Sequence, residues 1–121
     1  MNTYYKKDMI AIWRYLVEFA KDTNNKESLK TLFAEDVSTT LNIDQKTVDL
    51  TVVIIAIHCH KKHLPILSCL VIYEENDRDE YLVDSLGRIY DERITWEDEY
   101  DDFVASLDEV TKNPNRTYVL V

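Results

Sequence analysis

The chain has few of the residues that interrupt regular structure. Its 121 residues include one glycine, two prolines, two cysteines and three histidines. So little glycine and proline argues against long linkers and low-complexity tails, and a hydrophobic content of 45% is enough for one core. We therefore expect a single domain over residues 1–121.

Long apolar runs are also missing. No stretch approaches the roughly 20 apolar residues needed to cross a bilayer, and residues 1–8 lack the apolar core of a secretory signal. The two cysteines, Cys59 and Cys69, lie in apolar surroundings, which favours reduced core thiols over a disulfide framework. These features predict a soluble cytoplasmic protein that does not contact membranes.

Motifs of catalysis and cofactor binding are absent from the sequence. It has no glycine-rich phosphate loop and no serine-centred nucleophile elbow. The densest group of metal-ligating residue types is His58-Cys59-His60-Lys61-Lys62-His63, but a structural zinc site needs four ligands and adjacent lysines oppose a cation. We interpret this segment as the solvated end of a helix, and we expect no metal, no cofactor and no enzymatic activity.

Negative charge is unevenly distributed along the chain. The net charge is −9; residues 1–62 carry nine basic and eight acidic side chains, whereas residues 63–121 carry five basic and fifteen acidic ones. A basic surface is typical of nucleic-acid binding, because affinity comes largely from neutralising phosphates. The second half of the chain is therefore expected to repel DNA.

Residues 1–41 are predicted to form two amphipathic helices. Over residues 4–21, apolar side chains recur every three or four positions, which predicts a helix with a wide buried face. The polar run Thr23-Asn24-Asn25 ends this helix, and a second apolar stripe predicts another helix over residues 26–41.

Residues 38–64 match the spacing of a helix-turn-helix. The motif needs a small residue, an apolar residue, a residue tolerant of left-handed backbone, an apolar plug, a helix cap and an apolar anchor. These six positions are Ser38, Leu41, Asn42, Ile43, Asp44 and Val48. The alternative interpretation is a helical hairpin that binds no nucleic acid.

Residues 48–57 form a β-branched, apolar run that fits either a helix or a buried strand paired with residues 66–73. The helix is preferred because the apolar positions from Val48 to Cys59 include one continuous helical face, and because Asp44 can cap it.

The remainder is predicted to combine short strands with acidic helices. Pro65 begins a strand over residues 66–73, and Gly87 closes a short helix that begins at Asp79, with a strand over residues 81–83 as the alternative. Thr95 caps a last helix. The predicted units are 65–80 (strand and acidic wing), 81–112 (acidic helices) and 117–121 (a terminal strand that could pair with residues 69–73). The fold class is α+β, a helix-rich single domain with a small antiparallel β element.

A resemblance to a known family is carried by IHCHKKHLPILSCLVIY (57–73) and its continuation EYLVDSLGRIYDERITWEDEYDDF. Over residues 48–105, about half the chain, it resembles a winged-helix-like domain that precedes restriction-endonuclease-type catalytic domains and occurs in phage proteins. The positions that carry the resemblance are Cys59, Leu64, Pro65, Leu67, Leu70 and Val71. It implies a winged-helix-like unit in which residues 66–80 form the wing, and it brings no catalytic activity.

The sequence departs from that family after the predicted strand. Where the family has a glycine- and proline-containing turn, this chain has Glu74-Glu75-Asn76-Asp77-Arg78-Asp79-Glu80. A wing beside a phosphate backbone would need lysine or arginine, because like charges repel within a Debye length of roughly 8 Å.

The preferred hypothesis is a non-catalytic acidic protein that occupies a basic surface of a nucleic-acid-processing enzyme. Carboxylates spaced along a wing and a helix can imitate phosphates and pair with arginines. In general character such a chain resembles phage or mobile-element inhibitors of host defence nucleases, of the anti-CRISPR or anti-restriction type, which act in the host cytoplasm. The predicted partner-binding residues are Glu74, Glu75, Asp77, Asp79, Glu80, Glu97, Asp98, Asp101 and Asp102.

The alternative hypothesis is a transcriptional regulator that reads DNA through the helix beginning at Gln45. Lysines near both ends of that helix would then contact phosphates, while the acidic half faces a protein partner. The predicted DNA-binding residues are Gln45, Lys46, Asp49, Lys61 and Lys62.

Overall fold

Helices make up most of the part of the chain that the computed structural model describes, residues 2–75, 79–91, 93–110 and 118–121. The helices are α1 (Lys6–Lys21), α2 (Thr23–Glu27), α3 (Ala34–Leu41), α4 (Gln45–Lys61), α5 (Glu80–Asp91) and α6 (Tyr100–Val110), with 3₁₀ turns η1 (Leu67–Leu70) and η2 (Trp96–Glu99). The strands are β1 (Asn2–Tyr4), β2 (Leu32–Phe33), β3 (Val71–Ile72) and β4 (Tyr118–Leu120). The expectation of a helix-rich single small domain with short strands is met.

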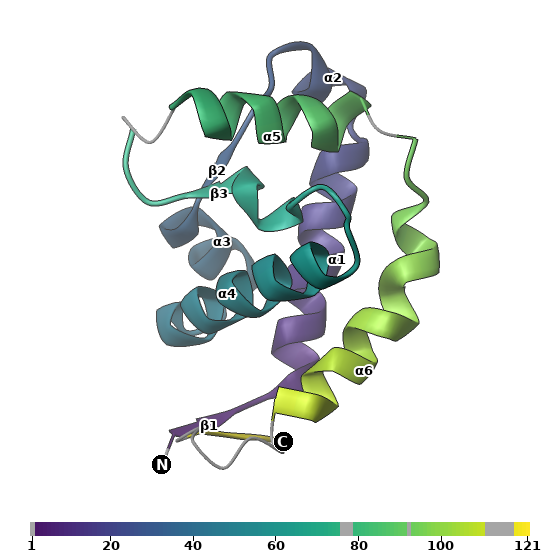
Figure 1. Ribbon diagram of the computed structural model, residues 1–121. Helices are drawn as coiled ribbons and strands as arrows, with labels where there is room; N and C mark the ends of the chain where they lie inside the picture. The colour runs from purple at the N-terminus through teal and green to yellow at the C-terminus, as the bar shows by residue number, and fades with distance from the viewer. Residues whose placement is uncertain (1, 76–78, 92, 111–117) are drawn as a thin grey trace.

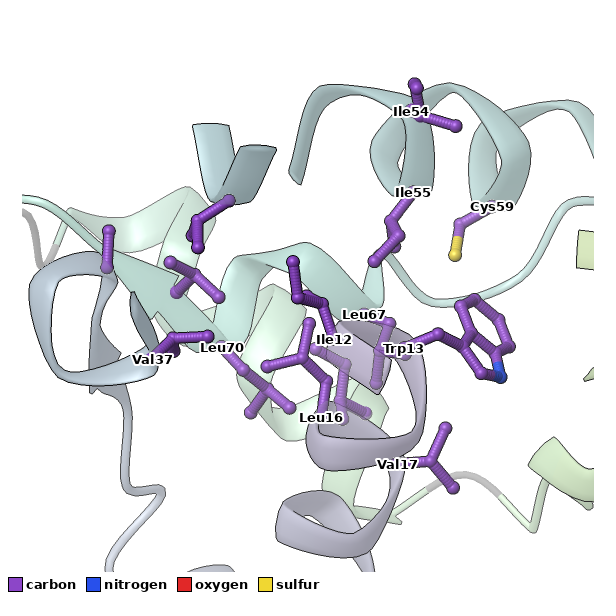
Figure 2. Packing of buried hydrophobic residues seen from close by; sticks show 14 of the residues in the cluster. Ile12, Trp13, Leu16, Val17, Val37, Ile54, Ile55, Cys59, Leu67 and Leu70 are labelled. Carbon is purple, nitrogen blue, oxygen red and sulfur yellow. The ribbon is translucent and has the colours of Figure 1, made fainter. Parts of the chain in front are cut away.

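Helix α1 runs along the middle of the fold and packs against α2, α3, α4, α5 and η1 (Figure 1). Its apolar stripe is the predicted one, and Figure 2 shows its side chains beside those of α4 and η1. The residues that α1 buries are Met9, Ile12, Trp13, Leu16 and Val17. This stripe forms the centre of the hydrophobic core.

The segment 48–57 is helical, so the preferred interpretation is confirmed. Val48, Ile55 and Cys59 are fully buried on one face of α4. The β-branched side chains fit because burial on the inner face outweighs their weak helix preference.

The turn between α3 and α4 has the local geometry that the helix-turn-helix spacing predicts. Asn42 ends α3 in the left-handed conformation, with φ 53° and ψ 49°. Ser38 Oγ donates a hydrogen bond to the Ile43 carbonyl at 2.5 Å, and Ile43 is buried. The Asp44 carboxylate accepts a hydrogen bond from the Lys46 amide at 3.2 Å, which caps α4.

The prediction of one helix over residues 26–41 is wrong. Asp22 caps the short helix α2 by accepting a hydrogen bond from the Asn24 amide at 2.9 Å. The chain then turns at Leu29, which has a positive φ of 49°, and continues into β2 before α3 begins. The local polar hydrogen bonds and the pairing of β2 with β3 override the apolar stripe, which continued across the break.

The prediction of a strand over residues 66–73 holds only for β3. Leu67 and Leu70, three positions apart, are both fully buried, and η1 directs them toward the core. A strand would place them on opposite faces, because side chains alternate along it. Burial of both leucines therefore selects the 3₁₀ turn.

The prediction of an antiparallel β element is also wrong, since both strand pairs in the described chain are parallel. β2 pairs with β3, and β4 pairs with β1 rather than with residues 69–73. The β1–β4 pair is extended by hydrogen bonds from the Lys6 amide to the Val121 carbonyl at 2.6 Å and from the Val121 amide to the Tyr4 carbonyl at 2.7 Å. Of the predicted wing, residues 66–80, the described part contains the strand β3, whose partner β2 lies outside the wing.

The helix expected to close at Gly87 continues to Asp91. Ile89 and Tyr90 are buried and extend the stripe begun by Leu82 and Leu86, so further burial favours continuing the helix. A methyl group added at Gly87 would meet no atom within 4 Å. Gly87 is therefore an interior helical residue with open space beside it.

The last helix also begins differently from the prediction. Thr95 makes no side-chain capping hydrogen bond, and the 3₁₀ turn η2 precedes α6. Apolar residues at helical spacing along η2 and α6 are nevertheless buried, namely Trp96, Phe103 and Leu107. The apolar spacing was thus a better guide than the capping residue.

Replacing Gly87 by alanine is expected to stabilise the fold by roughly 0.5–1 kcal/mol, because glycine in a helix interior loses more backbone entropy on folding than alanine. Urea unfolding followed by circular dichroism measures the change. The matched variant Ala105→Gly, at an exposed position of α6, should destabilise by a similar amount. A less stable Gly87→Ala protein would contradict a right-handed helical conformation at this position.

Candidate functional site

The polar residues at the start of α4 are bound to one another. Gln45 Nε2 donates a hydrogen bond to Asp49 Oδ1 at 2.8 Å, and the Tyr73 hydroxyl donates to the same oxygen at 2.8 Å. Partial burial and this bond raise the pKa of Tyr73, so the hydroxyl stays protonated as the donor. Of the predicted DNA-reading residues here, Lys46 alone extends into solvent.

Farther along α4, the outer face is apolar. Val53 and Ile57, one helical turn apart, are 53% and 40% exposed. Base edges are read mainly by hydrogen bonds, with apolar contacts limited largely to thymine methyl groups. The middle of α4 therefore offers little to a DNA groove.

The two lysines at the end of α4 differ in their surroundings. Lys62 Nζ forms an ion pair with Asp102 Oδ2 of α6 at 2.7 Å, which raises the pKa of Lys62 and lowers that of Asp102. Lys61 is exposed and forms no ion pair within the described residues. Lys62, a predicted phosphate contact, and Asp102, a predicted partner contact, thus neutralise each other's charge.

The acidic residues between β3 and α5 form the first predicted patch, the β3–α5 patch, defined as Glu74, Glu75, Asp79 and Glu80. Asp77 lies outside the described residues. Glu74, Glu75 and Glu80 are exposed, whereas Asp79 caps α5 by accepting a hydrogen bond from the Leu82 amide at 2.8 Å. Asp79 therefore has a structural role that the sequence analysis did not assign.

The second predicted patch, the α6 patch, consists of Glu97, Asp98, Asp101 and Asp102. Glu97 forms an ion pair with Lys21 of α1, which lowers the pKa of Glu97, and Asp102 is held by Lys62. Asp98 and Asp101 are exposed. Half of this patch is thus occupied in joining η2 and α6 to neighbouring helices.

The structure does not bring the two patches together. In Figure 1, the segment that directly follows β3 and the start of α5 lie at the upper left, whereas η2 and α6 lie at the right. A single flat partner surface would therefore contact one patch rather than both.

A groove of about 430 Å³ lies between α4 and α6. We call it the α4–α6 groove. Its apolar wall includes Ile54, Ile57 and Val110, and charged side chains line the rest together with His58 and Ser106. The complete lining is Ile54, Ile57, His58, Lys61, Lys62, Asp102, Ala105, Ser106, Glu109 and Val110.

His58 is buried rather than part of a solvated helix end, so the earlier interpretation of this residue is wrong. Its ring makes edge contacts with Trp13 and Phe103, at centroid distances of 5.9 and 5.7 Å. Its Nε2 atom and Glu99 Oε2 are buried without a hydrogen-bond partner among the described residues. The signal was present in the sequence, because His58 continues the helical spacing of Thr51 and Ile55.

The electrostatic environment keeps His58 neutral. Burial lowers its pKa below the usual 6.5, Lys61 and Lys62 act in the same direction, and Glu99 and Asp102 oppose them. The burial effect is the largest of these.

Within the described residues, no three histidine, cysteine, aspartate or glutamate side chains converge as a metal site would require. Cys59 and Cys69 are free thiols, and burial raises the pKa of Cys59 to about 11. A thiol with so high a pKa is a weak nucleophile at neutral pH.

No family model, curated protein or solved structure matches this chain. In addition, none of the helices described here has the length and apolarity to cross a membrane. Function must therefore be argued from the chain's own surfaces.

Lowering the pH through 6.5 is expected to reduce the free energy of unfolding through His58. Its pKa is lower in the folded than in the unfolded state, so the unfolded state binds more protons below pH 6.5 and is favoured there. In His58→Phe, the difference in stability between pH 7.5 and pH 5.5 should be smaller than in the wild type. Urea unfolding at both pH values measures it.

His60→Gln is the control, because His60 is exposed on the same helix. It should keep the wild-type pH dependence. An unchanged pH dependence in His58→Phe would show that His58 is not the responsible group.

Proposed function

We propose that the protein is a non-catalytic binding protein whose exposed carboxylates occupy a basic, nucleic-acid-binding surface of another protein. The observation that carries this proposal is the contrast between two surfaces. The polar side chains Gln45 and Asp49 of α4 are bound within the molecule, whereas Glu75 and Glu80 of the β3–α5 patch are exposed.

The β3–α5 patch is the better candidate contact. Two of the four acids of the α6 patch already pair with lysines of the same chain, so binding a partner would require these pairs to be exchanged. In the β3–α5 patch, Asp79 caps α5, whereas Glu75 and Glu80 are exposed. Tyr81, which directly follows Glu80, is 69% exposed and adds an aromatic face on which an arginine could stack.

The physical basis is electrostatic. A chain with a net charge of −9 accelerates encounter with a basic surface, and carboxylates that pair bidentately with arginine fix the orientation. Partners of this kind are enzymes that hold nucleic acid in a basic channel. We therefore propose an inhibitor of the phage or mobile-element type, acting by DNA mimicry on a defence nuclease in the host cytoplasm.

A second candidate, a DNA-binding transcriptional regulator, is favoured by one observation, the helix-turn-helix-like geometry from Ser38 to Val48. The apolar middle of α4 and the Lys62–Asp102 pair count against it. Helical hairpins of this shape also occur without nucleic acid, so we prefer the inhibitor.

The inhibitor proposal predicts that the protein protects DNA from a defence nuclease in proportion to the charge of the β3–α5 patch. Reversing Glu74, Glu75 and Glu80 to lysine should raise the half-inhibitory concentration at least about 10-fold, because each close charge pair contributes to binding. The measurement is DNA cleavage by purified restriction and RNA-guided nucleases as the protein is titrated.

The matched control reverses Glu18, Glu27 and Glu35, three exposed acids of the first half of the chain, and changes the net charge equally. It should inhibit within about 3-fold of the wild type, since distant exposed charges are largely screened. If both triple variants lost inhibition equally, the β3–α5 patch would act only through the net charge of the chain, and the proposed contact would be wrong.

The same proposal predicts little affinity for DNA itself. Fluorescence anisotropy with a labelled duplex at about 150 mM salt should give no saturable binding tighter than about 10 µM, and Lys46→Ala should change nothing. Tight binding whose salt dependence decreases in Lys46→Ala would instead support the regulator.

A further inference from the structure

The outer face of α4 and the α4–α6 groove beside it form one continuous, partly apolar surface. Val53 and Ile57 are exposed on α4, and Ile57 also lines the groove. Burial of such exposed aliphatic side chains against another molecule would gain about 25 cal/mol per Å² of apolar surface removed from water. This surface is thus suited to contact another molecule.

The charges of this surface are arranged at its two ends. α4 and α6 run in opposite directions across the groove (Figure 1), and the Lys62–Asp102 pair lies where α4 ends and α6 begins. Lys61 is at that end, whereas Glu109 is seven residues farther along α6, roughly 10 Å away along the helix axis. Among the residues that line the groove, one end therefore carries two lysines and one aspartate and the other end carries Glu109, with the apolar residues between them.

We propose that this surface binds a second copy of the same chain through antiparallel contact of the two α4 helices. With a two-fold axis near Ile57, the Ile57 side chains of both copies meet and Val53 of each copy lies toward the end of the other helix. The same rotation carries Lys61 of the second copy toward Glu109 of the first, and Lys61 of the first toward Glu109 of the second.

Charge complementarity selects a second copy over other partners. A two-fold interface uses the same patch on both molecules, so it needs both charges and the apolar centre on one surface, as found here. A nucleic acid would be repelled by Glu109, and a uniformly acidic or basic protein would match one end only. The interface is independent of the proposed inhibitor function, because it uses no residue of the β3–α5 patch.

Sedimentation equilibrium from about 10 µM to about 1 mM tests the proposal. The average mass of the wild type should rise with concentration from 14.3 kDa toward twice that value. Ile57→Glu should remain at the monomer mass over the whole range, because it places a carboxylate at the two-fold axis. Circular dichroism confirms that the variant is folded.

A charge exchange tests the register. Lys61→Glu should weaken the dimer by about 10-fold, because two attractive pairs become repulsive. The double variant Lys61→Glu with Glu109→Lys should return to within about 3-fold of the wild type. Val83→Glu on α5, at a position 41% exposed, is the control and should leave the dimer unchanged.

The proposal is overturned if the wild type stays monomeric at 1 mM, if Ile57→Glu dimerises as well as the wild type, or if the double variant is not rescued. None of these outcomes depends on whether the chain inhibits a nuclease.

Discussion

The fold depends on the contact between the rings of Trp13 and Phe103. The two rings are stacked at a centroid distance of 4.4 Å with an interplanar angle of 12°, and Trp96 and His58 approach Trp13 edge-on. These four side chains come from α1, α6, η2 and α4. The single cluster therefore fixes the positions of α4 and α6 relative to α1, and with them the groove that the two helices enclose.

This dependence explains which parts of the structure were predictable from the sequence. Elements whose apolar residues recur at helical spacing, such as α1 and α4, were predicted because local pattern and tertiary burial agree. The turn at Asn42 was predictable for a local reason, because asparagine tolerates the left-handed conformation that ends α3. The prediction of one helix over residues 26–41 was wrong because hydrogen bonds near Asp22 and the pairing of β2 with β3 interrupt an otherwise continuous apolar stripe.

The predicted site was less accessible to sequence reasoning. The described carboxylates of both predicted patches are exposed, but the partners of two of them lie far away in the sequence, as Lys21 does for Glu97 and Lys62 does for Asp102. Spacing along the chain holds no information about such pairs. The α4–α6 groove was missed because its two walls come from segments far apart in the sequence. His58 was misassigned because it was grouped with His60, Lys61, Lys62 and His63, whereas its neighbours in space are the aromatic rings of Trp13 and Phe103.

The pairing of β1 with β4 has a consequence for synthesis on the ribosome. Residues 2–4 have their hydrogen-bonding partners at residues 118–120, so this strand pair cannot form until residues 118–120 have emerged. Contacts of such large sequence separation form late, because a long loop must close before they are gained. Helices α1 to α4 lie closer together in the sequence and can pack earlier, and the β1–β4 pair beside Lys6 joins them later.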